Sequence, residues 1–119
     1  MTPADVTSLV ERELATFRYD PPPPGSGLLG RPWSAERVAR GVEDLRAALV
    51  PPRRATLLVR ALGASVAERR EAWVVAEAAG LVVVFDPAAR EFALAEPAEE
   101  GALADINVRG DLVGTFLAA

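Results

Sequence analysis

The 119 residues carry seventeen carboxylates and thirteen cationic side chains, all of them arginine, which gives a formal net charge of −4. The absence of cysteine and histidine excludes disulfides, Cys/His zinc sites, thiol nucleophiles and imidazole catalysis. The acidic balance disfavours nucleic-acid binding, and the 50% apolar content predicts one globular domain over residues 1–119.

The chain starts with a predicted helix over about residues 3–19. Apolar side chains recur there at helical spacing, and Thr2 and Pro3 suit the N-cap and the first turn. Four consecutive prolines from position 21 onwards prevent the helix from continuing.

A Pro/Gly-rich loop is expected over residues 20–33. Its glycines Gly25, Gly27 and Gly30 spell GxGxxG, the pattern that lets the backbone approach a pyrophosphate. A nucleotide site needs a strand before these glycines and a helix directly after them, and the sequence predicts neither. The loop is therefore interpreted as a flexible linker.

A second helix is predicted over about residues 35–49. Ser34 suits its N-cap, and the side chains that follow form one apolar stripe. Trp33 and Val38 have the spacing of a hydrophobic staple, in which the two side chains pack over the start of the helix. Pro51-Pro52 is expected to end this helix.

From about residue 55 the sequence predicts strands, because β-branched and apolar residues occur in short runs between turn residues. The expected strands form a mainly antiparallel meander of four or five strands over about 55–109. They cover 55–62, 71–77, 81–86, 91–96 and a short segment around Ile106 and Val108. Asp86-Pro87 favours a type I turn, and Gly80 supplies the positive φ that closes the preceding hairpin.

Residues 65–79 allow two interpretations. Ser65 and Glu68 have the spacing of a capping box, which favours a helix that ends at Gly80. The aromatic and β-branched run 73–75 favours a strand. We prefer the strand, because a helix would place Arg70 on its apolar stripe.

The C-terminal residues 112–119 are predicted to form a short helix, preferred here to a strand, with Asp111 as its N-cap. An ion pair of Arg109 with Asp105 or Asp111 would fix the preceding turn. The predicted fold class is therefore α+β, with two N-terminal helices packed on one face of the meander and a short C-terminal helix.

The densest acidic stretch, with Glu96, Glu99, Glu100 and Asp105, is the first candidate binding surface. These residues lack the spacing of a calcium loop, and we expect neither a metal ion nor a cofactor. A solvated acidic loop is the simpler interpretation. The functional alternative is a docking patch for a cationic protein, since complementary charge speeds association and selects partners.

The second candidate is a ligand pocket between a helix and the sheet, covered by the loop 21–33. Its possible ligand-binding residues are Trp33, Asp86, Arg109 and Asp111. For Trp33, burial in the core is the simpler role.

The sequence therefore favours a small acidic, non-enzymatic protein-interaction module. An inhibitor or immunity protein of the bacterial type, bound to a basic partner in the cytoplasm, fits these observations, without nucleic acid or membrane as a partner. A small-molecule-binding or carboxylate-dependent enzymatic module is the alternative. A subunit that associates with itself is the third hypothesis.

Overall fold

The computed structural model describes residues 1–19, 33–61 and 63–119. The prolines and the GxGxxG glycines of the predicted linker lie outside these residues. The helices are α1 (Pro3–Thr16), α2 (Ala35–Ala48), the 3₁₀ turn η1 (Glu99–Gly101) and α3 (Leu112–Leu117). The strands are β1 (Leu49–Val59), β2 (Glu68–Ala78), β3 (Leu81–Asp86), β4 (Glu91–Pro97) and β5 (Leu103–Gly110).

The structure confirms the predicted N-cap of each of these three α-helices. Thr2 and Asp5 form a reciprocal capping box at α1, and the Ser34 hydroxyl accepts a hydrogen bond from the Arg37 amide at α2. Asp111 caps α3 in the same way, by accepting from the Gly114 amide at 3.0 Å. Helix α1 ends three residues earlier than predicted, because Phe17 is already in an extended conformation.

The second helix ends within one residue of its predicted end at 49, but the first strand begins earlier than the predicted residue 55. Helix α2 ends at Ala48, and β1 begins at Leu49, whose backbone is extended, and continues through both prolines. Strand β1 pairs with β2 at Leu49 and then from Arg53 onwards, with a register shift between them. The prolines lie inside this shift, where their missing N–H groups remove no hydrogen bond from the ladder.

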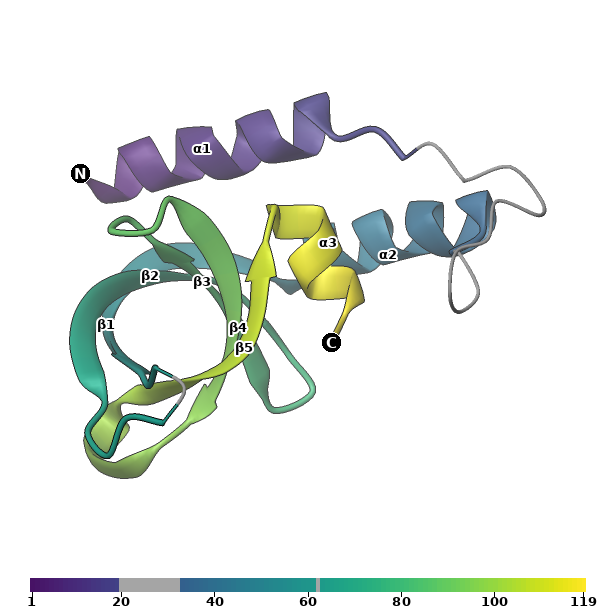
Figure 1. Cartoon of the computed structure of the whole chain (residues 1–119). Helices are drawn as coiled ribbons and strands as arrows, with labels where there is room; N and C mark the ends of the chain where they lie inside the picture. Colours follow the sequence, from purple (N-terminus) through teal and green to yellow (C-terminus); the bar gives the residue numbers. More distant parts are fainter. Residues whose placement is uncertain (20–32, 62) are drawn as a thin grey trace.

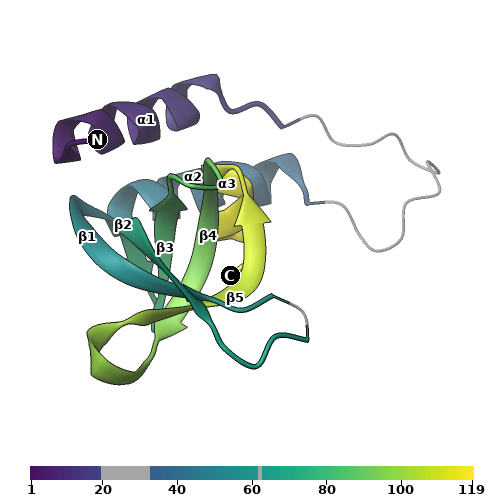
Figure 2. The same cartoon turned by 60° about the vertical axis from the view of Figure 1, so that its left-hand side comes forward.

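The five strands form a closed barrel in the order β1-β2-β3-β4-β5 (Figures 1 and 2). Consecutive strands are antiparallel, as the predicted meander requires, and parallel pairing of β1 with β5 closes the barrel. Residues 68–78 are strand β2, so the helix considered for residues 65–79 is wrong. Trp73-Val74-Val75 is buried in this strand, where β-branched and aromatic side chains pack well.

The barrel separates two apolar clusters. One contains residues of all five strands and none of the helices, including Leu57, Val74 and Val84, and fills the barrel interior. The other joins the outer side of β2, β3 and β4 to all three helices. Because these strands are covered on both sides along part of their length, their buried segments 72–76, 82–85 and 92–95 are continuously apolar rather than alternating.

The β2–β3 hairpin contains an unfavourable residue, from which we predict a stabilising substitution. Its two-residue turn has positive φ at both Ala79 (52°) and Gly80 (82°), as a type I′ turn requires. Alanine is strained in this conformation, whereas asparagine adopts it readily. We expect Ala79→Asn to raise the free energy of unfolding by about 1 kcal/mol, measured by urea denaturation. Gly80→Ala, the control, should lower it.

Candidate functional site

A network of charged side chains crosses four strands at one end of the barrel. Arg70 on β2 donates to the Asp86 carboxylate on β3 at 2.8 Å, and Arg109 on β5 lies 3.1 Å from the same carboxylate oxygen. Arg109 also donates to Asp105 through its Nε at 2.8 Å and lies 3.8 Å from Glu91 on β4. We call these five residues the barrel-end network.

The pleat of the strands explains why these side chains meet. Arg70 is four residues from the interior residue Val74 on β2, and Asp86 is two residues from the interior residue Val84 on β3. Side chains an even number of residues apart on a strand lie on the same face, so Arg70 and Asp86 point to the interior side of the sheet. Asp105 and Arg109 on β5 lie opposite the interior residues of β4. The network therefore continues the barrel interior, where charged side chains replace apolar ones at its end.

A bulge in β5 brings Asp105 and Arg109 together. The β4–β5 ladder shifts register between these residues, and Asn107 has a positive φ of 65°. The Asn107 amide donates to Asp105 at 2.8 Å, which holds the carboxylate facing Arg109. Bulges commonly redirect side chains in this way at the ends of barrels. The predicted ion pair of Asp105 with Arg109 is thus present, and Arg109 does not pair with Asp111.

Asp86 is the centre of the network and has no exposed surface. Burial alone would raise the pKa of its carboxyl group, but hydrogen bonds from Arg70 and Arg109 and the charge of both guanidinium groups outweigh it and lower the pKa. For Arg109, burial alone would lower the pKa of the guanidinium group, but the hydrogen bonds and charges of Asp105 and Asp86 outweigh burial and raise the pKa. Asp86 is therefore ionised and fully partnered.

This arrangement gives the network a structural role. The second Asp86 oxygen accepts a hydrogen bond from the Ala88 amide at 3.1 Å, which confirms the predicted turn after β3. With three donors and no exposed surface, the Asp86 carboxylate is not accessible to a substrate. The sequence identified Asp86, Asp105 and Arg109, but placed them in two different sites. It missed Arg70 and Glu91, whose positions could be inferred only from strand parity and register.

The other sequence-predicted residues lie apart from the network. Trp33 is half-buried against the apolar cluster that joins β2, β3 and β4 to the three helices. Its carbonyl oxygen accepts a hydrogen bond from the Tyr19 hydroxyl at 2.6 Å. Asp111 is exposed and caps α3. The structure therefore does not gather Trp33, Asp86, Arg109 and Asp111 into one pocket.

The acidic stretch is divided between two environments. Glu96, near the end of β4, and Glu99 and Glu100, in η1 between β4 and β5, are exposed, whereas the Asp105 side chain is 1% exposed and bound to Arg109. We call Glu96, Glu99 and Glu100 the acidic connection. It lies on the side of the barrel away from α1 (Figures 1 and 2).

Local hydrogen bonds fix the backbone of the acidic connection. The Ala98 amide donates to the Ala102 carbonyl at 2.8 Å, and the Ala102 amide donates to the Glu99 carbonyl at 3.2 Å. Glu100 has a positive φ of 59°, followed by Gly101 at 75°. Within residues 1–19, 33–61 and 63–119, none of the three glutamates forms an ion pair.

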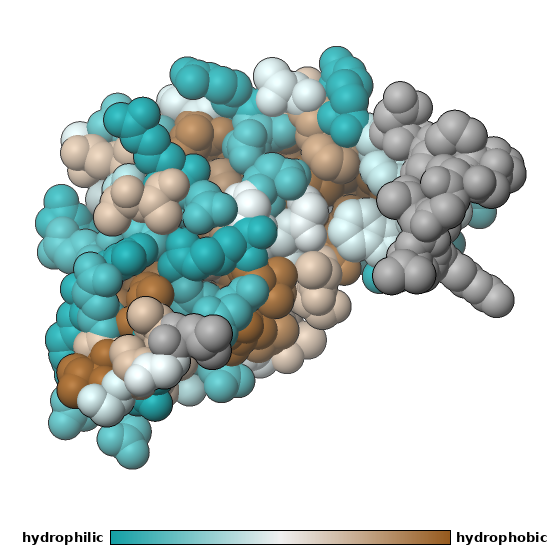
Figure 3. Space-filling model, viewed as in Figure 1, coloured by the Kyte–Doolittle hydropathy of each residue, from teal (hydrophilic) through white to brown (hydrophobic). Residues whose placement is uncertain are grey.

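A cleft of about 450 Å³ lies between α2, the β2–β3 hairpin and α3. A second cleft, of about 410 Å³, is lined by the same hairpin together with Arg53, Pro97 and Leu103. In the view of Figure 3, hydrophilic side chains cover most of the surface, and hydrophobic ones are visible in smaller areas between them.

In the part of the chain that the structure describes, no group of three carboxylates is arranged to hold a metal ion. No helix in those residues is long and apolar enough to cross a membrane.

Comparison with known proteins finds no matching family model, no matching curated protein and no matching solved structure.

Proposed function

We propose that this chain is a non-enzymatic protein-interaction module, of the inhibitor or immunity type, that binds a basic partner protein through the acidic connection. The observation that carries the proposal is the display of three exposed carboxylates on a backbone fixed by local hydrogen bonds. Glu96 lies near the end of β4, and Glu99 and Glu100 lie in η1 directly after it, so one partner that covers this end of the hairpin would contact all three.

The charges of the acidic connection are open to a partner. Two other glutamates, Glu77 and Glu91, already face Arg53 and Arg109. A partner's cation would have to compete with those arginines, but none of the described residues competes for the acidic connection. Binding there gains attraction without breaking an internal ion pair.

The proposal also specifies the chemistry of the partner. Exposed carboxylates fit arginine and lysine side chains, and arginine can bind one carboxylate through two hydrogen bonds. Complementary charge mainly accelerates association and weakens as salt screens it. The complex should therefore form fastest at low ionic strength.

The test replaces all three glutamates in the full chain, Glu96→Gln with Glu99→Gln and Glu100→Gln. The immobilised wild type captures proteins from native lysate of its source at low salt, and the captured protein is purified and titrated. We expect one basic protein at a stoichiometric ratio, and roughly tenfold weaker affinity for the triple variant at low salt. The difference should shrink at high salt.

A matched variant separates this surface from net charge. Glu11→Gln with Glu36→Gln and Glu43→Gln removes the same three charges from exposed positions on α1 and α2. It should bind the partner like the wild type. Equal weakening of both triple variants, or capture of no basic protein, contradicts the proposal. A molar mass that rises with concentration in light scattering, with no other protein captured, would replace it with self-association.

A further inference from the structure

We propose that the cleft between α2, the β2–β3 hairpin and α3 binds an organic monoanion, a carboxylate attached to an alkyl or aryl body. The cleft is independent of the acidic connection, which contributes no residue to it. Its volume of about 450 Å³ lies within the range of small-molecule sites.

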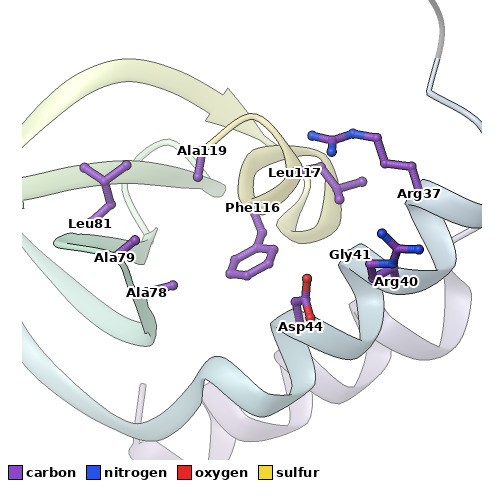
Figure 4. Close-up of a pocket in the computed structure, with 10 residues that line it drawn as sticks. All are labelled: Arg37, Arg40, Gly41, Asp44, Ala78, Ala79, Leu81, Phe116, Leu117 and Ala119. Carbon is purple, nitrogen blue, oxygen red and sulfur yellow. The ribbon is translucent and has the colours of Figure 1, made fainter.

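Small residues determine the shape of the cleft. Ala78 and Ala79 at the end of the hairpin form one wall, where larger side chains would fill the space. On the opposite side, Gly41 of α2 lets α3 approach closely, since a Cβ atom there would lie 2.0 Å from Leu117 Cδ2. Figure 4 shows the Phe116 side chain projecting from α3 into the middle of the cleft.

The walls supply apolar contact for the ligand body. Leu81 and the hairpin alanines lie on one side of Phe116, and α2 lies on the other (Figure 4). Apolar walls offer few hydrogen bonds to the water that fills the cleft. An alkyl or aryl group that displaces this water buries apolar surface, which is favourable. The apolar part of the ligand therefore lies between the hairpin and Phe116.

Two arginines give the cleft its preference for an anion. Arg37 and Arg40 lie one turn apart on α2 and line the cleft, and neither forms an ion pair within the described residues. The chain as a whole is acidic, whereas the charged side chains that line this cleft are two arginines and one aspartate. A carboxylate placed between them would receive charge-assisted hydrogen bonds.

The carboxylate of Asp44 favours a ligand that carries a single negative charge. It lines the same cleft one turn beyond Arg40, on the Phe116 side in Figure 4. Its charge repels a second negative charge beside the arginines, so a carboxylate fits better than a dianionic phosphate. The site thus combines two cations, one anion and an apolar wall.

The test titrates the full-length protein with decanoate, decyltrimethylammonium and decyl phosphate, each below its micelle concentration, by calorimetry. We expect decanoate to bind and the other two to bind at least about tenfold more weakly. Arg37→Gln with Arg40→Gln should reduce decanoate affinity by a similar factor. Arg12→Gln with Arg46→Gln removes the same charge from exposed residues outside the cleft and should leave it unchanged.

Two further variants keep the test decisive. Ala78→Trp fills the cleft from the hairpin side and should abolish decanoate binding, while Asp44→Asn should strengthen it. Circular dichroism confirms that each variant is folded. Equal binding of decanoate and decyltrimethylammonium, full binding by the Arg37/Arg40 double variant, or no decanoate binding to the wild type would each overturn the proposal.

Discussion

Replacing Asp86 with asparagine should lower the free energy of unfolding by about 3 kcal/mol. The substitution keeps the size of the side chain and an oxygen that can accept from the Ala88 amide, but removes the negative charge. Arg70 and Arg109 then face each other's charge without the carboxylate that both now contact. Removing one partner of a buried ion pair is costly because it leaves the other charge uncompensated. Urea denaturation at pH 7 measures the loss.

Glu91→Gln is the matched control for the charge change. The Glu91 side chain is 44% exposed and lies 3.8 Å from Arg109, and ion pairs at the surface contribute less than about 1 kcal/mol. If the two substitutions lower the free energy of unfolding by the same amount, the buried ion pairs of Asp86 contribute no more than the surface ion pair of Glu91.

The same pair of variants predicts how stability depends on pH. The pKa of Asp86 is lower in the folded protein than its ordinary value, so the folded state binds fewer protons than the unfolded state in acid. Its contribution is complete above the unfolded pKa of about 3.9 and is lost as the pH falls further. We expect wild-type stability to fall more steeply below about pH 4 than that of Asp86→Asn. Parallel curves would show that Asp86 is not the group responsible.

The second large effect is expected in the barrel interior. Leu57→Ala should lower the free energy of unfolding by about 3–4 kcal/mol, since a buried leucine that is truncated leaves a cavity. Leu57 is fully buried and faces residues from the other strands, which are held by the closed ladder and cannot move inward to fill the space. Thermal and urea denaturation measure the change.

Leu58→Ala provides the comparison on the same strand. Leu58 is only half-buried and points to the opposite side of β1, so its truncation should cost about 1 kcal/mol. Equal losses at the two positions would contradict an interior that is closed around Leu57.

The elements of the fold were largely predictable because each has a local cause. Ser34 and Asp111 act as caps, β3 matches its predicted bounds, and the run 73–75 favours a strand over a helix even though Ser65 and Glu68 have the spacing of a capping box. Pro51-Pro52 misled the prediction of β1, because proline interrupts a helix but is tolerated where a strand lacks ladder pairs.

The closed barrel and the barrel-end network could not be predicted in the same way. Closure depends on β1 meeting β5, which no local pattern encodes. Asp105 is grouped with Glu96, Glu99 and Glu100 by proximity in sequence, but its position on the interior side of β5 places it beside Arg109. The residues of the cleft come from α2, the hairpin and α3, and nothing in their spacing indicates that they meet.

The parallel seam between β1 and β5 has a consequence for how the chain acquires its structure during synthesis. Its pairs, Leu57 with Leu103 and Leu58 with Ala104, join segments that leave the ribosome far apart in time. The hairpins of β2, β3 and β4 can form as they emerge, but the barrel cannot close until β5 is available. Until then the interior side of the sheet is open to water, and nascent chains arrested before Leu103 should be cut by protease far faster than those extended past Gly110.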